Sequence, residues 1–508
     1  FLRRIRSPVG EKIPSLKNKH IFRKYAAFLL ALRWPFNENK RLKPFVPKML
    51  SNHIKHSAFI KNATLLWSLA GPLILGQVAV VGMTVTDIYM AGQVGADSLA
   101  AVQLGGSIWS IINLIVIGIM IGNSPIIGNH WGAGNRHLVR FQFQQALWLA
   151  VPVGLIVNCA ILFGIYILGR LDIPYEVYDI GRRYLMPFLI TGLMFPAFFA
   201  FRSTFEGMGD IRPVMVFNGA AFFLNIALDY ALVFGKFGLP AMGAEGAAWA
   251  TAIVMTFLLI CMAIYAQRSH TMRALKLYSE FARANVAAIV NILRLGVPIA
   301  LNIAAEISFF AIIPLLIAHL GSDVVGAHAI AINIDSLAFM IPLGMAQALT
   351  IKVSHAEGAG DPRLARRFCL VGFKLVFMLG LIMAAVKISL RSDFASWFSP
   401  DPNVQMIATN LFFFAAALGS VDCLQMAASG ALRGYKDVRM PLLIQVVAFW
   451  GIAFPIAYSL ALTDFWGEPL GVYGFWIGTI IGASCAGVGL ISRWNIVSRR
   501  RIQALATL

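Results

Sequence analysis

The chain has 508 residues, of which 59% are hydrophobic and 13% charged, a balance that excludes an ordinary soluble domain and indicates a polytopic membrane protein. Its net charge of +19 would suggest nucleic acid as a partner, but residues 1–62 alone hold fifteen Lys or Arg against Glu11 and Glu38. A basic segment of a membrane protein more often sets topology or meets anionic headgroups. Membrane lipids are therefore the expected partner, and nucleic acid is not.

Residues 1–62 are predicted to form a basic tail ahead of the first membrane span. The apolar stretch at 25–32 is short, and no small-residue cleavage site follows it at the usual distance, so a signal peptide is not expected. An Arg-rich, acid-poor transit peptide is the alternative. The five cysteines are scattered through hydrophobic segments without paired spacing, which favours neither disulfides nor a cysteine metal site.

Twelve apolar runs are long enough to cross the hydrocarbon layer as helices. They are predicted at 65–91, 99–128, 141–169, 184–205, 213–235, 246–266, 290–319, 324–351, 368–389, 404–431, 440–463 and 471–492. Because twelve is even, both termini lie on one side of the membrane. The Lys- and Arg-rich segments, which are the tail, 136–140, 268–283, 352–367, 433–439 and 493–501, assign that side to the cytoplasm. A cell inner (plasma) membrane is the expected location.

The second half of the chain repeats the first at an offset of 226 to 228 residues. Patches of small residues begin at Pro72, Gly95, Gly132, Gly207 and Gly243 and again, in the same order, at Pro298, Gly321, Gly358, Gly434 and Gly471. Six spans separate each patch from its copy, so both halves insert the same way up, as in parallel-repeat transporters. The predicted fold is an all-α polytopic membrane protein with twelve transmembrane helices in two six-helix lobes, related by a pseudo-two-fold axis along the membrane normal.

The repeat also predicts the boundaries of the parts. A basic cytoplasmic tail is expected at 1–62, the first lobe at 63–267, a cytoplasmic interlobe loop at 268–288, the second lobe at 289–495 and a basic C-terminal tail at 496–508.

The seventh span contains one acid, Glu306, near its middle. An ionised carboxylate at that depth costs about 2.5–3.5 kcal/mol, so it needs a proton, a cation or another partner inside the protein. Asn302 lies one helical turn earlier on the same face, which favours an oxygen-rich ion site. A tie between two helices, without a role in transport, is the alternative.

The tenth span also has an acid near its middle, Asp422, with Gln425 and Ser429 on the same helical face. The seventh span runs outward and the tenth inward, so Glu306 and Asp422 lie at comparable depth and are expected to meet inside the second lobe. Two carboxylates in one site cannot both stay charged without a counter-ion. The pair therefore predicts a proton or sodium switch, with Glu306 and Asp422 as the candidate sodium ligands.

Three more acids lie in the predicted spans. Asp335 follows His328 by seven residues on roughly the same face, so both are candidates to join the cluster, although hydrogen-bonded packing is the alternative for His328. Asp87 is the only acid of the first span, and its repeat position is Ile313, so the lobes differ in acid placement. A coupling role and a structural role both stay open for Asp87. Asp229, near the lipid boundary of the fifth span, is expected to be structural.

No segment matches the phosphate-binding pattern G-x-x-x-x-G-K-[ST], so ATP is not expected to drive the protein, and no cofactor is expected. The Gly-rich patches at 132–134, 207–209 and 358–360 instead predict tight turns after long helices. The chain has 37 Phe and 19 Met, and those between the lobes are expected to line a cavity for flat organic cations.

The two-lobe plan, with the segments LGVPIALNIAAEISFF, HAIAINIDSLAFMIPLGMAQA and GALRGYKD, resembles the multidrug and toxic compound extrusion (MATE) family, and most of all its NorM-type branch. The resemblance covers about residues 60–495. It implies a secondary active multidrug efflux antiporter, not an enzyme, that exports organic cations in exchange for sodium ions or protons by alternating access. It also implies that Glu306 and Asp422 form the second-lobe cation site and that Asp87 is the first-lobe acid. Asp335 departs from the pattern, because NorM-like sequences tend to carry a small polar residue there.

Three other functions remain as alternatives. A flippase for a lipid-linked precursor would need a cavity rich in Arg or Lys, and the predicted spans hold few of them, Lys374 and Lys387 among them. An intramembrane enzyme would need a convergent nucleophile, His or metal set, and of the deep histidines only His328 has an acid nearby. A channel or receptor is the third. The protein is expected to be a monomer, and the sequence leaves the choice between sodium and protons open.

Overall fold

The computed structural model describes residues 58–506, so most of the predicted basic tail, residues 1–57, lies outside the described part. Within it, twelve helical segments are long and apolar enough to cross a membrane. The first six are α2 (Ala58–Val94), α3 (Ala96–Ile121) with α4 (Ser124–Gly132), α5 (Arg136–Leu168), α7 (Phe188–Met208), α8 (Arg212–Phe234) and α9 (Ala244–Arg268). The last six are α11 (Val286–Ile317), α12 (Ser322–Gly358), α13 (Pro362–Ser389), α15 (Pro402–Gly434), α16 (Arg439–Val446) with η2 (Val447–Ala453) and α17 (Phe454–Leu462), and α18 (Val472–Ala506). The prediction of twelve spans is confirmed.

Two predicted spans are broken and one is distorted. The second divides between α3 and α4 at Gly122 and Asn123, and the fourth is preceded by α6 (Tyr175–Leu185), which ends just before Pro187. Asn123 is buried at its break, where its side chain accepts from Gln142 at 3.3 Å and donates to Ser203 Oγ at 3.3 Å. The eleventh span passes through a π-helical turn, η2, a local distortion that often accompanies function.

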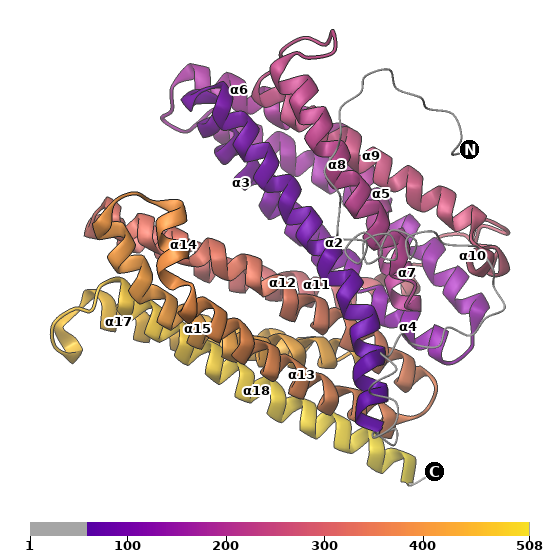
Figure 1. Cartoon of the computed structure of the whole chain (residues 1–508). Helices are drawn as coiled ribbons and strands as arrows, with labels where there is room; N and C mark the ends of the chain where they lie inside the picture. Colours follow the sequence, from indigo (N-terminus) through magenta and orange to yellow (C-terminus); the bar gives the residue numbers. More distant parts are fainter. Residues whose placement is uncertain (1–57, 507–508) are drawn as a thin grey trace, which may run out of the picture. The chain divides into compact units, whose positions relative to one another are not determined.

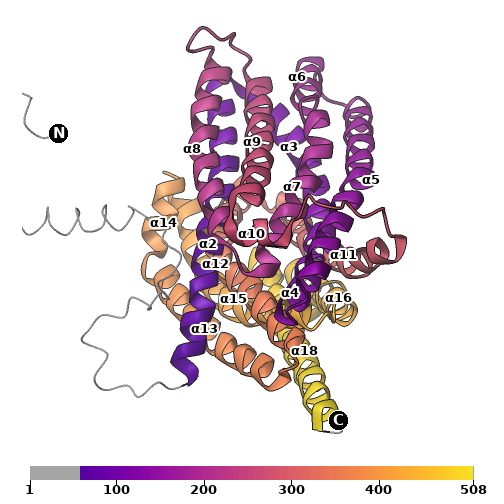
Figure 2. The same ribbon diagram turned by 90° about the vertical axis from the view of Figure 1, so that its right-hand side faces the viewer.

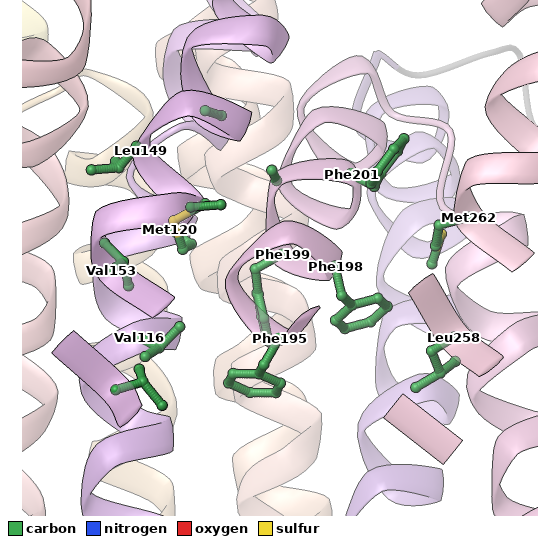
Figure 3. Close-up of a cluster of buried hydrophobic side chains, with 14 of the residues drawn as sticks. Val116, Met120, Leu149, Val153, Phe195, Phe198, Phe199, Phe201, Leu258 and Met262 are labelled. Atoms are coloured by element: carbon green, nitrogen blue, oxygen red, sulfur yellow. The ribbon is translucent and has the colours of Figure 1, made fainter. Parts of the chain in front are cut away.

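The core of the first lobe is rich in phenylalanine, because α7 lies among its other helices and carries an aromatic run (Figure 3). Phe195, Phe198 and Phe199 lie between side chains of α3 and α5 on one side and of α9 on the other. Trp109 of α3 stacks on Phe188 with ring centroids 4.4 Å apart. Such stacked and edge-on ring pairs stabilise the core beyond the apolar area that they bury.

The two halves of the chain form separate groups of helices, coloured indigo to pink and salmon to yellow in Figures 1 and 2. Contacts between the groups follow the predicted symmetry. The first span of each half packs against the second span of the other, α2 on α12 and α11 on α3, and α4 also packs on α12. Such reciprocal contacts are what a pseudo-two-fold axis produces. The boundaries assigned above to the lobes stay predictions.

These contacts between lobes lie toward the ends that carry the Lys- and Arg-rich loops, here called the basic half. Glycines allow the backbones to touch: a Cβ at Gly296 of α11 would overlap the carbonyl oxygen of Ile119, and a Cβ at Gly118 would lie 2.7 Å from the amide nitrogen of Ala300. Lys436, which follows α15, donates to Asn129 Oδ1 of α4 at 3.0 Å, and burial lowers the pKa of this lysine. The lobes are therefore closed on each other in the basic half.

The loop between the lobes is held tightly against the first lobe. It contains the short helix α10 (His270–Leu275), then turns at residues 276–280 and an irregular segment to residue 285. Gln144 of α5 donates to Leu277 O at 3.0 Å and accepts from Ala282 N at 3.0 Å, while Gln145 donates to Arg283 O at 3.1 Å and accepts from Asn285 N at 2.7 Å. Both glutamines are buried. The loop is thus fixed to the first lobe by side chains, although the sequence predicts only a basic loop that connects the two lobes.

Replacing Gln145 by Ala is expected to release the C-terminal end of the interlobe loop from the first lobe. The backbone groups of Arg283 and Asn285 would lose their partners, at a cost of about 1–3 kcal/mol. Trypsin should then cleave after Arg283 faster, by about fivefold or more. Gln267→Ala is the matched control, because that exposed side chain makes no hydrogen bond among the described residues. Equal cleavage rates in both variants would show that Gln145 does not hold the loop.

Candidate functional site

Glu306 lies on α11 between Pro298 and Pro314 and faces the interior of the second lobe. Its two carboxylate oxygens accept long hydrogen bonds from Gln425 Nε2 of α15 at 3.5 Å and from Gln445 Nε2 of α16 at 3.4 Å. Both donors are neutral amides, and the charge of Arg433 acts on Glu306 without forming an ion pair with it among the described residues. The site therefore has unused capacity for a proton or a small cation.

A cavity of about 30 Å³ adjoins Glu306 and is large enough for a water molecule or a small ion. Its polar lining comes from Asn302, Ser429, Gln445 and Arg433 besides Glu306. Carboxylate, amide and hydroxyl oxygens are the donors that hard cations prefer. The structure thus brings the predicted supporting residues Asn302 and Ser429 to the same cavity as Glu306.

Gln445 and its neighbourhood were missed by the sequence interpretation. The signal was weak: Gln445 is a single amide in the apolar run of the eleventh span. Trp450, in the π-helical turn that follows, donates from Nε1 to Ala305 O at 3.0 Å, directly beside Glu306. The distortion of η2 therefore lies where the eleventh span contacts the backbone of α11 next to the acid.

Asp422 lies on α15, one turn before Gln425, in the same group of charges. It lies close enough to Glu306, Asp335 and Lys387 for their charges to act on it. Among residues 58–506 no side-chain hydrogen bond to its carboxylate is found. The structure thus places the two predicted switch acids close enough for their charges to interact, and Gln425, one turn after Asp422, contacts Glu306.

Asp335 has a partner that the sequence interpretation did not assign to it. Its carboxylate forms an ion pair with Lys387 of α13, whose ammonium also donates to Ala415 O of α15 at 3.2 Å. The prediction that Asp335 belongs near Asp422 fits this placement, but its charge is already matched by Lys387. Asp335 is therefore not a free ligand for an ion.

His328 does not take part in this cluster, although it lies on the same helix as Asp335. Its ring packs edge-on against Trp476 of α18 with centroids 5.8 Å apart, and its Nδ1 has no partner among the described residues. The two residues border a separate cavity of about 10 Å³ together with Thr479. Spacing on one helical face placed His328 near Asp335, but two turns of helix keep them apart.

The first lobe contains a second group of acids. Asp87 of α2 accepts from Asn225 Nδ2 of α8 and from Thr251 Oγ1 of α9, both at 3.0 Å. Asp229, which we expected near the lipid boundary, is instead fully buried and adjoins Asp87. Two adjoining carboxyl groups require a proton or a cation between them. Asn225 and Thr251 were missed because their contact with Asp87 joins three helices.

A buried ion pair that the prediction also missed lies at the lobe contact. Arg202 Nε of α7 donates to Glu206 Oε1 at 2.7 Å, and both side chains are buried. The predicted fourth span stopped at residue 205, one residue before this acid. Glu206 lines a cavity of about 10 Å³ between the lobes with Gln347 and Thr350.

Arg433 separates this cavity from the one beside Glu306, since it lines both. The prediction placed Arg433 in a basic loop, but it is the penultimate residue of α15 and donates to Ser429 Oγ at 3.5 Å. Its positive charge acts on Glu306. Each acid near the lobe contact therefore has a basic neighbour. Glu206 forms an ion pair with Arg202, and Glu306 lies within the electrostatic influence of Arg433.

The chain is similar to known proteins over most of its length. The family model described as MatE matches residues 72–231 and 298–459. The chain is 37% identical over 459 residues to "Multidrug resistance protein PmpM" of Pseudomonas aeruginosa, covering 89% of this chain and 95% of that one. It is 35% identical to "Multidrug resistance protein NorM" of Vibrio vulnificus, covering 87% and 96%. Its fold resembles a crystal structure of a Vibrio cholerae MATE transporter in a bent form, with a TM-score of 0.77, 19% identity and coverage of 87% and 98%.

Proposed function

The chain belongs to the MatE family, and from this premise we propose that it exports organic cations in exchange for sodium ions or protons, by alternate opening of its two lobes. It is a multidrug efflux transporter and not an enzyme. The observation that supports antiport is the second-lobe cluster, where Glu306 lines an oxygen-rich cavity and Asp422 of a neighbouring helix lies close enough for the two charges to interact. An acid pair inside a membrane protein that lacks a nucleotide motif is the usual means of coupling to an ion gradient.

The energy available from one ion is sufficient for efflux. One charge moving down about 100 mV releases about 2.3 kcal/mol, and each tenfold ion gradient adds about 1.4 kcal/mol. One or two ions can thus sustain a drug gradient of about tenfold to a few hundredfold.

The direction of coupling follows from linkage between ion and drug. The lobes touch in the basic half, which we place in the cytoplasm, so the described form is closed on that side. Ion binding at Glu306 and Asp422 would favour the form open to the outside and lower its affinity for the drug. By reciprocity, drug binding lowers the affinity for the ion.

The first-lobe acids supply a second position for coupling. Asp87 and Asp229 adjoin each other, Asn225 and Thr251 donate to Asp87, and no basic side chain of residues 58–506 forms an ion pair with either acid. We assign this pair a proton or a sodium ion as well. The protein would act as a monomer in a cell inner membrane, with both termini in the cytoplasm.

A lipid-linked phosphate substrate is less well supported. A flippase needs basic side chains that are free to bind phosphate, but Arg202 is paired with Glu206 and the charge of Arg433 is opposed by Glu306. Near the lobe contact, these two basic groups therefore have acidic neighbours. Organic cations match the remaining carboxylates and aromatic faces better.

The direct test is export of ethidium from proteoliposomes or cells under sodium and proton gradients imposed one at a time. We expect export to follow at least one of the two gradients and to stop when that gradient is collapsed. Export that ignores both gradients would contradict antiport. The gradient that drives export identifies the coupling ion.

A further inference from the structure

Lys387 is a buried lysine that has no part in the proposed transport cycle. It comes from α13, near the end of that helix, and its residue is 3% exposed. Its ammonium pairs with Asp335 of α12 and donates to Ala415 O of α15. One positive charge therefore contacts three helices of the second lobe in its interior.

The tenth span leaves room for this ammonium. A Cβ at Gly419 would lie 2.8 Å from Lys387 Nζ and 3.6 Å from Asp335 Oδ1. Ala415, Gly419 and Asp422 follow each other on one face of α15, because they are four and three residues apart. The ammonium thus lies against the helix face that carries Asp422, at the position where the chain has no side chain.

The lysine also has a donor to spare. An ammonium has three N–H groups, and here one contacts Asp335 and another contacts Ala415 O. Its charge acts on Asp422 as well. Lys387 is therefore an intramolecular cation that lies near two acids of the cluster, Asp335 and Asp422.

Charge counting shows what this cation does to the site. The cluster has three acids, Glu306, Asp335 and Asp422, and two bases, Lys387 and Arg433. With all five charged, one negative charge remains. The interior of a membrane protein tolerates little net charge, so one monovalent cation neutralises the cluster.

We propose that Lys387 is a tethered cation that occupies the place of a second exchangeable ion, so that the second lobe binds one sodium ion or one proton per cycle, shared by Glu306 and Asp422. Lys387 is thus a positioning residue that sets ion stoichiometry. The proposal rests on the proposed antiport function and specifies the number of ions at one of its sites. A purely structural tie between α12, α13 and α15 is the competing explanation.

Neutral variants distinguish the two explanations, with ethidium export by proteoliposomes measured against sodium concentration and against pH. Asp335→Asn leaves Lys387 to balance Asp422, so the half-saturating concentration of the coupling ion should rise about tenfold or more. Lys387→Gln leaves two net negative charges in the second lobe, so the Hill coefficient for the ion should rise above the wild-type value by up to one. The double variant Asp335→Asn/Lys387→Gln restores the single net charge and should recover both values of the wild type.

Unchanged ion dependence in Asp335→Asn overturns the proposal, and so does a double variant as weak as Asp335→Asn. Lys387→Arg serves where a neutral variant does not fold: it keeps the charge but not the shape, so the Hill coefficient should stay at the wild-type value. A changed coefficient in Lys387→Arg supports the structural explanation. If the wild type exports no ethidium under either gradient, the antiport function fails instead. The charge count can then be tested without transport, by measuring how much sodium or low pH raises the melting temperature of the purified variants. The ion should stabilise Asp335→Asn less than the wild type, and the double variant as much as the wild type.

Discussion

Replacing Glu306 by Gln is expected to abolish most ion-driven export while leaving the protein folded. Glutamine has nearly the size of glutamate, and it can keep both contacts if Gln425 or Gln445 turns its amide and accepts through its unpartnered oxygen. It has no negative charge, so a cation in the adjoining cavity would lose its main ligand. Loss of such a buried charge contact costs about 3 kcal/mol, which corresponds to about a hundredfold loss in ion affinity.

The measurement is the initial rate of ethidium export under the active gradient, with folding checked by thermal denaturation. Ser308→Ala is the matched control on α11, since its exposed hydroxyl donates only to Ala305 O one turn away. Asp422→Asn should behave like Glu306→Gln, because both acids hold the same ion. Wild-type export by both acid variants would remove these residues from coupling.

Replacing Gly296 by Ala is expected to have the second largest effect, by forcing the lobes apart in the basic half. The new Cβ would overlap the carbonyl oxygen of Ile119 on α3, and backbone cannot yield as a flexible side chain does. Overpacking of this kind costs about 1–3 kcal/mol. Because each lobe keeps its own core, the cost falls on the closed form and shifts its population by about fivefold to a hundredfold.

The shift can be measured as labelling of a cysteine placed at Ser354, a buried residue of α12 that closes on Gly128 of α4. Labelling should be faster in the Gly296→Ala background, and ethidium export should be slower. Gly487→Ala on α18 is the matched control, because a Cβ there meets nothing within 4 Å. Equal labelling with and without Gly296→Ala would contradict a tight closure at this contact.

The helices themselves could be predicted from the sequence, because hydrophobic length and bounding charges are local properties. The breaks could be predicted only in part, from Pro125 and Pro187, which stand at the starts of α4 and α7. The side chain of Asn123, at the first break, is held by groups of α5 and α7, and the π-helical turn near Trp450 accompanies a contact with α11. Both depend on which helices are neighbours. The early start of α2 at Ala58, inside the predicted tail, has a different cause, since the helix extends beyond its apolar part.

The residues of the candidate site could likewise be predicted only where the signal is local. Asn302 and Glu306 could be paired in advance because they share one helical face, and an acid in an apolar span is conspicuous. Partners on other helices, such as Gln445, Lys387 and Thr251, carry no sign in the sequence of the residue that they contact. His328 shows the opposite error, because spacing along α12 suggested a contact that its packing on Trp476 replaces.

If ion and drug exchange at linked sites, a gradient of the drug must drive a flux of the ion, and this flux is the most direct test of the linkage. Proteoliposomes are given an ethidium gradient and no ion gradient, and the flux of sodium or protons is recorded. The account predicts a counter-flow of one of these ions in the wild type and none in Glu306→Gln or Asp422→Asn. Movement of ethidium by the wild type without any counter-flow of sodium or protons would contradict it.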